Sequence, residues 1–143
     1  MTISISHDHV GISIAPEVHD ATVDWYARHF GFQVERSFSS HGTTFTFLVS
    51  GNAKIELLTG ATRETARTEN VLTSMDPSRL HHLCFAVEDL DAAVTALHDG
   101  GVELIGGPME IDAIGQRIAF VTDNVGTIIE LSEPGTWPGG RRV

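Results

Sequence analysis

Hydrophobic and polar residues alternate along two short stretches of the chain that match each other. The first stretch reads HVGISI and begins at His9; the second reads HLCFAV and begins at His82, 73 positions later. In both, apolar side chains occupy every second position, which is typical of a β-strand with two different faces. Matching patterns at a fixed offset indicate that the chain contains an internal repeat.

A helical period follows each of these strands. The apolar residues fall at i, i+3, i+4 and i+7, at Val23, Tyr26, Ala27 and Phe30 in the first half and at Leu90, Ala93, Val94 and Leu97 in the second. Asp20 and Asp89 lie near the predicted helix starts, where a carboxylate can accept hydrogen bonds from free backbone N–H groups. Glycines, Gly31 in one half and Gly100–Gly101 in the other, are predicted to end the helices.

Three further strand-like runs follow each helix. They read FQVERSFS, TTFTFLVS and AKIELLT in the first half, and VELIGGP, QRIAFVTD and TIIELSE in the second. Each half therefore reads β-α-β-β-β, and the predicted fold class is α+β with two tandem βαβββ modules. We place these modules at about 5–60 and 80–134, joined by a polar linker at 61–79 and followed by a tail at 135–143, all within one domain spanning 1–143.

Composition and charge exclude several classes of protein. The net charge is −10, whereas a nucleic-acid-binding protein normally presents a basic face. No apolar run approaches the roughly 20 residues that cross a bilayer, and the first residues lack the pattern of a signal peptide. The single cysteine, Cys84, cannot form an intramolecular disulfide and suits a reducing compartment. We therefore expect a cytoplasmic protein that binds neither nucleic acid nor membrane.

Four potential metal ligands occupy matching positions of the repeat. His9 and His82 open the first strand of each half, whereas Glu56 and Glu130 lie in the last strand of each half, 74 positions apart. Imidazole and carboxylate ligands suit nickel, cobalt, zinc, manganese or iron, and the absence of thiolates argues against a closed structural zinc site. Small residues that leave room for a substrate follow on the ligand side of the two first strands: Gly11, Ser13, Cys84 and Ala86.

Each ligand has a simpler interpretation when it is taken alone. A histidine that opens a strand is usually a hydrogen-bonded surface residue, and a glutamate among apolar residues usually faces solvent. Their equivalent places in a repeat favour metal binding. Among the other candidates, Cys84 is interpreted as a residue lining a cavity, and His81 is predicted to point away from His82 because a one-residue shift reverses the strand face. His19 is predicted to be solvated.

The segments that carry these features resemble a known family. DHVGISI, WYARHFGF, KIELL, HHLCFAVEDLDAAV and FVTDNVGTIIELSEP resemble the paired modules of the vicinal oxygen chelate superfamily. The resemblance covers about residues 5–134 and implies a cup-shaped mixed eight-stranded sheet around a metal, in a protein that is often a homodimer. Carried over by position, His9, Glu56, His82 and Glu130 match a His-Glu-His-Glu ligand set similar to that of glyoxalase I and related epimerases.

Other branches of the superfamily match in part. Methylmalonyl-CoA epimerases are similar in the DHVGI opening, but typically carry glutamine at the position of Glu56 and a His-Pro-Lys stretch at residues 122–124. Extradiol dioxygenases use a two-histidine, one-carboxylate iron site, and bleomycin-type binding proteins lack the ligands. An Fe(II) dioxygenase and a metal-free protein that sequesters a small molecule are the alternatives.

The ligand set implies metal-dependent proton transfer. A metal with open positions can polarise a substrate with vicinal oxygens and stabilise an enediolate. Glu130 is the leading candidate for the base, while Glu56 either remains a ligand or serves the opposite face of the substrate. The predicted function is an isomerase or lyase acting on a small α-hydroxy-carbonyl substrate, with one nickel, cobalt, zinc or manganese ion per chain and iron less favoured.

Overall fold

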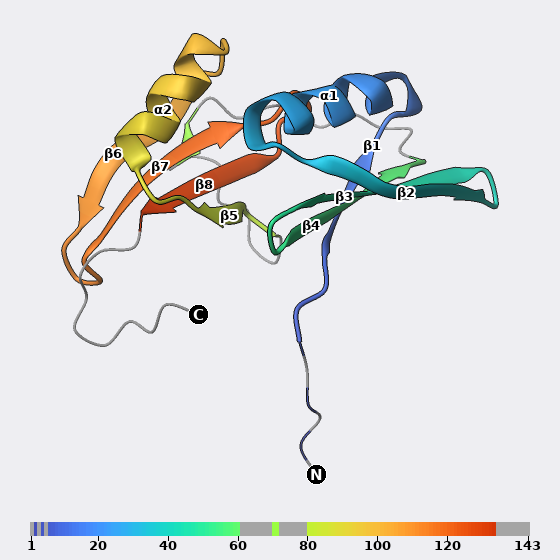
Figure 1. Ribbon diagram of the computed structural model, residues 1–143, viewed down its shortest axis with the longest axis horizontal. Helices are drawn as coiled ribbons and strands as arrows, with labels where there is room; N and C mark the ends of the chain where they lie inside the picture. Colours follow the sequence, from blue (N-terminus) through green and yellow to red (C-terminus); the bar gives the residue numbers. More distant parts are fainter. Residues whose placement is uncertain (1, 3, 5, 61–69, 72–79, 134–143) are drawn as a thin grey trace. The chain divides into compact units, whose positions relative to one another are not determined.

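Two compact units make up the chain, at residues 1–65 and 66–143, and we name them module one and module two. The computed structural model describes residues 2, 4, 6–60, 70–71 and 80–133. Each module contains one four-stranded sheet and one α-helix in its described part (Figure 1). None of the helices among these residues is long and apolar enough to span a membrane.

Module one contains the sheet built from the first half of the chain. Its elements in chain order are β1 (Val10–Ile14), the 3-10 turn η1 (Pro16–Val18), α1 (His19–Phe30), β2 (Gln33–Ser40), β3 (Thr43–Ser50) and β4 (Ala53–Thr59). The strand order is β1-β4-β3-β2. β1 runs parallel to β4, whereas β2, β3 and β4 pair as antiparallel neighbours.

Module two repeats this arrangement. Its elements are β5 (Leu83–Ala86), α2 (Leu90–Asp99), β6 (Leu104–Ile111), β7 (Gln116–Thr122) and β8 (Ile128–Glu133). The strand order is β5-β8-β7-β6, again with the first and last strands parallel. The predicted α+β class with two tandem βαβββ modules is therefore confirmed.

Alternation of side chains gives the sheet of module one two different faces. On the face toward α1, Leu48, Ile55 and Leu57 are at most 1% exposed, and the helix contributes the fully buried Tyr26. Residues of opposite parity, including Glu56, point to the other face, which we call the open face of module one. The apolar face supplies the module's hydrophobic core and holds the open face in a fixed register.

The helix ends follow the predictions in part. Asp89 Oδ1 accepts a hydrogen bond from the backbone N–H of Ala92 at 2.9 Å, so Asp89 caps α2. Asp20 does not cap α1, because η1 leads directly into the helix and places Asp20 inside the first turn. Gly31 ends α1 with a φ of 66°, the left-handed conformation that glycine adopts most readily.

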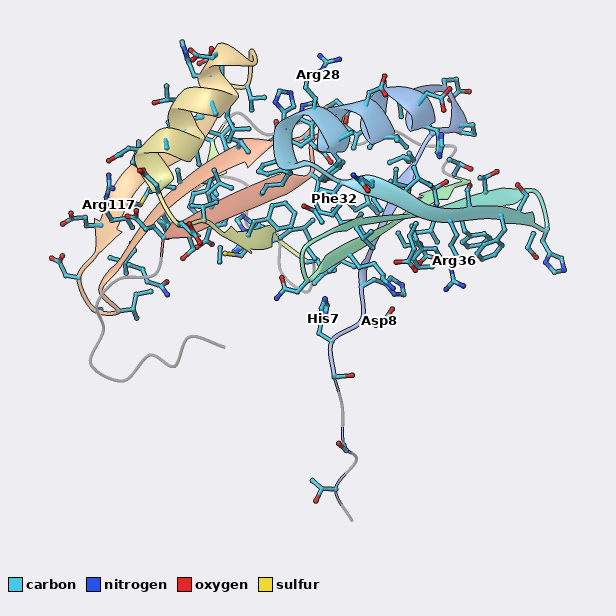
Figure 2. All side chains as sticks on the ribbon, viewed as in Figure 1. His7, Asp8, Arg28, Phe32, Arg36 and Arg117 are labelled. Atoms are coloured by element: carbon cyan, nitrogen blue, oxygen red, sulfur yellow. The ribbon has the colours of Figure 1, made fainter. Side chains whose placement is uncertain are left out.

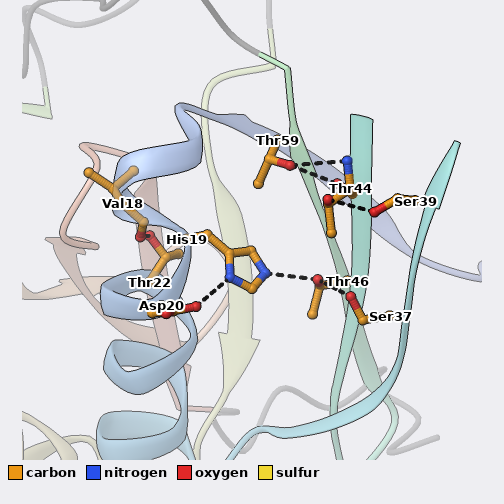
Figure 3. A network of polar contacts seen from close by, with 9 residues as sticks. All are labelled: Val18, His19, Asp20, Thr22, Ser37, Ser39, Thr44, Thr46 and Thr59. Carbon is orange, nitrogen blue, oxygen red and sulfur yellow. Dashed lines mark hydrogen bonds and ion pairs between the residues drawn. The ribbon is translucent and has the colours of Figure 1, made fainter. Parts of the chain in front are cut away.

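A polar network joins α1 to the sheet of module one (Figure 3). His19 Nε2 lies 2.8 Å from the hydroxyl of Thr46, which in turn lies 2.9 Å from the hydroxyl of Ser37. Asp20 contacts the other ring nitrogen of His19 at 2.8 Å. The prediction that His19 is solvated is wrong, because Thr46, only 1% exposed, needs a polar partner beneath the helix.

Part of the predicted linker belongs to module two. Val71 is 6% exposed and packs in one cluster with Phe120 and Ile128. The rest of the predicted linker, at 61–69 and 72–79, and the predicted tail at 135–143 lie outside the described residues. The described piece therefore contributes an apolar side chain to the sheet face that carries Phe120.

Candidate metal centre

The first candidate pair lies on the open face of module one. His9 directly precedes β1, and its Nε2 atom lies 3.1 Å from Glu56 Oε2 on β4. The Glu56 side chain is only 15% exposed, and the ring of Phe47 meets the His9 ring edge-on at 5.3 Å. Gly11 pairs with Glu56 across β1 and β4. A Cβ atom there would lie 3.1 Å from the Leu58 side chain and 3.7 Å from Glu56 Oε2, so glycine avoids crowding Leu58 next to the carboxylate.

Module two presents the same arrangement. His82 directly precedes β5, and its Nε2 atom lies 2.8 Å from Glu130 Oε2 on β8. The Glu130 side chain is 15% exposed, and the Phe120 ring meets the His82 ring edge-on at 5.7 Å. Cys84 pairs with Glu130 across β5 and β8, as Gly11 does with Glu56. Each module therefore brings its predicted histidine and glutamate together, beside an aromatic ring.

The second ring nitrogen of each histidine has a different partner. His9 Nδ1 lies 2.6 Å from Asp8 Oδ2. The hydrogen bond to Asp8 is the main cause that raises the pKa of His9; burial opposes it, and the charge of Glu56 adds to it. His82 Nδ1 instead lies 2.9 Å from His81 Nδ1. The prediction that His81 points away is wrong, because His81 and His82 precede β5 and the alternation of a strand does not apply to them.

Cys84 contacts one of the candidate ligands without being a nucleophile. Burial, followed by the negative charge of Glu130 and a hydrogen bond to it, raises the pKa of the Cys84 thiol to about 11. The thiol therefore stays protonated at neutral pH and can donate to Glu130. A protonated thiol is not the activated nucleophile that a catalytic cysteine requires. That Cys84 lines a cavity stays a prediction.

The donor atoms of both pairs fit a divalent metal. In each pair an imidazole nitrogen and a carboxylate oxygen point at each other, so a metal can take the place of the proton that they share. Nitrogen and oxygen donors suit zinc, nickel, cobalt and manganese. Asp8 also fits the carboxylate that commonly holds the second nitrogen of a ligating histidine. Within the described residues, no group of three or more His, Cys, Asp or Glu side chains forms a metal site.

Comparison with known proteins identifies the family. The profile described as Glyoxalase/Bleomycin resistance protein/Dioxygenase superfamily matches residues 8–120. The chain belongs to this superfamily. The match includes the first three candidate ligands, and the fold of this superfamily member carries the fourth, Glu130, at the equivalent place of the repeat.

Relatives of this superfamily member include named epimerases. The mitochondrial methylmalonyl-CoA epimerase of Dictyostelium discoideum is 31% identical over 130 residues, covering 88% of this chain and 76% of that protein. The ethylmalonyl-CoA/methylmalonyl-CoA epimerase of Cereibacter sphaeroides is 30% identical over 131 residues, covering 88% and 96%. These relatives are methylmalonyl-CoA epimerases, the branch from which this sequence departs at Glu56 and at residues 122–124.

A solved structure shows the same fold. The glyoxalase family protein from Enterococcus faecalis superposes with a TM-score of 0.70 at 24% identity, covering 91% of this chain and 97% of that chain. At 24% identity this match shows a shared fold and does not show a shared activity.

The structure identifies residues next to the candidate ligands that sequence patterns alone did not single out. Phe47 pairs with Glu56, and Phe120 pairs with Glu130, so each ring stands beside a candidate ligand on the same face. Asp8 was not predicted as a partner of His9. Its signal in the sequence was weak, because any acidic residue beside a strand-opening histidine is usually solvated.

Proposed function

We propose that this superfamily member is a metal-dependent epimerase that moves a proton on the carbon next to the carbonyl of an acyl-CoA thioester of the methylmalonyl type. The observation that carries the proposal is the duplicated histidine–glutamate pair, one in each module. The 30–31% identity to epimerases named for methylmalonyl-CoA supports this substrate class over the α-hydroxy-carbonyl compounds expected from the sequence.

One divalent metal is proposed to bind His9, Glu56, His82 and Glu130, with nickel, cobalt, zinc and manganese as candidates. Each module offers two of these donors, one nitrogen and one oxygen. When bound, the metal would supply positive charge beside the carbonyl oxygen of the substrate and make the neighbouring C–H group more acidic.

The two carboxylates are proposed to move the proton. Glu130 is the leading base, and the protonated Cys84 thiol beside it donates a hydrogen bond that helps to hold the carboxylate in place. Glu56 is the candidate for the opposite face of the substrate, because epimerisation requires removal of the proton on one face and its return on the other. Asp8 fixes the orientation of the His9 ring through Nδ1.

Solvent-deuterium exchange with each epimer of methylmalonyl-CoA tests this proposal. Metal-loaded wild-type protein is expected to interconvert the epimers and to incorporate deuterium at the carbon beside the thioester. Glu130→Gln is expected to abolish exchange from one epimer, and Glu56→Gln from the other. Glu110→Gln, at an exposed position of β6, is the matched control.

Three outcomes are informative. Wild-type protein that holds about one metal per chain but exchanges no proton with either epimer would refute the epimerase. Full activity of Glu56→Gln with both epimers would limit Glu56 to the role of a ligand. Consumption of oxygen by an iron-loaded protein would favour the dioxygenase alternative instead. A homodimer and a cytoplasmic location stay predictions.

A further inference from the structure

A row of paired residues crosses the open face of module one. Arg36 on β2 pairs with Phe47 on β3, Phe47 pairs with Glu56 on β4, and Glu56 pairs with Gly11 on β1. Neighbouring strands lie roughly 4.8 Å apart, so Arg36 begins about two strand spacings from the candidate ligand Glu56. Figure 2 shows Arg36 and Asp8 on the side of this sheet away from α1, and Arg28 on the helix.

The Arg36 guanidinium lies over the Phe47 ring. Its central carbon is 5.1 Å from the ring centroid, within the range of a cation–π contact. The contact holds the positive charge over the ring, and the planar guanidinium keeps its N–H donors for other partners. A guanidinium of this kind can give two parallel hydrogen bonds to a carboxylate.

The charge around Arg36 favours an anionic ligand from solution. Lys54 lies 3.4 Å from a carboxylate oxygen of Glu35, and Arg117 lies 2.8 Å from one of Asp91. In the described part of the chain, no carboxylate pairs with Arg36. In a chain with a net charge of −10, a cation on the same sheet face as Glu56 reduces the repulsion that an acidic substrate would meet.

The equivalent row of module two has no such cation. Gly106 pairs with Phe120, and Phe120 pairs with Glu130. A Cβ atom at Gly106 would lie 2.8 Å from a methyl carbon of Val71 and 3.3 Å from the Phe120 ring. Val71 thus occupies the space above Gly106, and a long side chain cannot lie over Phe120 as Arg36 lies over Phe47.

We propose that Arg36 binds the free carboxylate of the acyl group and thereby selects acidic acyl thioesters. Phe38 and Phe45, whose rings stack with centroids 5.2 Å apart next to Phe47, supply an apolar surface for the rest of the acyl group. We assign the acyl carboxylate, and not a CoA phosphate, as the anion that Arg36 binds. The acyl carboxylate is attached to the reacting carbon, whereas the pantetheine arm separates the phosphates from that carbon. The inference rests on the proposed function for its substrate class.

Two probes that differ by the carboxylate test the inference. Methylmalonyl-CoA and propionyl-CoA share the CoA moiety and the three-carbon chain, but propionyl-CoA lacks the free carboxylate. Calorimetric titration of wild-type protein is expected to give tighter binding of methylmalonyl-CoA. Arg36→Gln is expected to lower the affinity for methylmalonyl-CoA by about ten-fold or more, as is typical for loss of a charged hydrogen-bond partner. Its affinity for propionyl-CoA is expected to fall by less than about two-fold.

Two further variants complete the experiment. Arg36→Lys keeps the charge but loses the planar fork, so its affinity for methylmalonyl-CoA is expected to fall between those of wild type and Arg36→Gln. Arg28→Gln, which makes the same change in net charge on α1, is expected to bind both probes like wild type. Thermal unfolding of Arg36→Gln close to that of wild type would show that the exposed edge strand stays folded.

Each failure points to a different conclusion. Equal weakening of both probes in Arg36→Gln would assign Arg36 to a CoA phosphate and overturn the inference, as would no change with either probe. A wild-type protein that epimerises methylmalonyl-CoA while Arg36→Gln keeps its selectivity would refute the inference alone. A wild-type protein that selects the carboxylate through Arg36 but never epimerises would refute the proposed reaction and leave the inference standing.

Discussion

The two modules share a framework and differ in what surrounds it. In both, a histidine precedes the first strand, and a glutamate lies on the last strand. An aromatic ring on the next strand pairs with the glutamate and meets the histidine ring edge-on. The partner of the second histidine nitrogen is the carboxylate of Asp8 in module one and the imidazole of His81 in module two. The repeat thus fixes the donor atoms, while their charge environment is free to differ.

A second difference concerns the strand neighbours of the glutamates. Glu56 faces Gly11, which offers no side chain, whereas Glu130 faces the Cys84 thiol. Two carboxylates in equivalent positions therefore receive different hydrogen bonding. In an epimerase the two faces of the substrate are not equivalent either, so a duplicated site whose halves have diverged suits the proposed reaction better than a symmetric one.

The largest expected effect tests whether both modules are needed. His9→Ala and His82→Ala each remove one nitrogen donor, and each is expected to lower metal affinity by more than about 100-fold, beyond the usual effect of an outer partner. Metal content after dialysis, measured by elemental analysis, checks this. His98→Ala, on the exposed side of α2, is the matched control. Undiminished metal binding by either variant would show that one module holds the metal alone.

The next effect separates the two outer partners. Asp8→Asn is expected to weaken metal binding by about 10–100-fold, because the carboxylate makes His9 a better donor. His81→Asn is expected to cost less, since an imidazole partner offers no negative charge to support His82. Competition with a metal-sensitive dye measures both. A larger loss of metal affinity in His81→Asn than in Asp8→Asn would contradict the role assigned to the charge of Asp8.

The same pair predicts a pH dependence in the metal-free protein. Because Asp8 raises the pKa of His9, the protonated pair stabilises the fold below the ordinary histidine pKa, and this contribution is lost as the pH rises through the raised pKa. NMR titration of the His9 ring in wild type and Asp8→Asn checks the shift. The variant is expected to titrate at lower pH; an unchanged midpoint would mean that Asp8 does not control His9.

A smaller effect tests the packing that distinguishes module two. Gly106→Ala is expected to destabilise the protein by about 1–3 kcal/mol, because the new methyl group overlaps Val71. On a Val71→Ala background the same change is expected to cost less. Denaturant unfolding of the double-mutant cycle measures the coupling. Additive effects would show that Val71 does not occupy the space above Gly106.

The smallest effect concerns the thiol of Cys84. With its pKa raised to about 11, little thiolate is present at pH 8, and alkylation by iodoacetamide is expected to be far slower than for free cysteine. Because burial is the main cause of the raised pKa, Glu130→Gln is expected to accelerate the reaction only modestly. Rapid alkylation of the native wild-type protein would contradict this.

Much of the fold could be predicted from the sequence. The alternating runs match the strands within a few residues, since one face of each strand is buried and must be apolar. The repeat also brought His9 into register with His82 and Glu56 with Glu130, and the structure places each histidine beside the glutamate of its own module. Closure of the two sheets into one cup stays a prediction.

The rest required knowledge of neighbouring strands. Asp8 and His81 lie before the strands begin, where side-chain parity does not decide direction. The contact of Arg36 with the Phe47 ring depends on a register shift between Val34 and Arg36, which no residue pattern reveals. His19 was judged by its helix alone, although its partner comes from a strand that follows later in the chain.

The exposure of β2 has an evolutionary consequence. Every residue of this edge strand is exposed, so substitutions along it should cost little stability, typically within about 0.5 kcal/mol for surface positions. The proposed acyl selectivity at Arg36 is therefore on a different strand from the candidate donors of module one, which lie before β1 and on the partly buried β4. Natural divergence or laboratory redesign could exchange one acyl preference for another through single changes in β2, without rebuilding the metal centre.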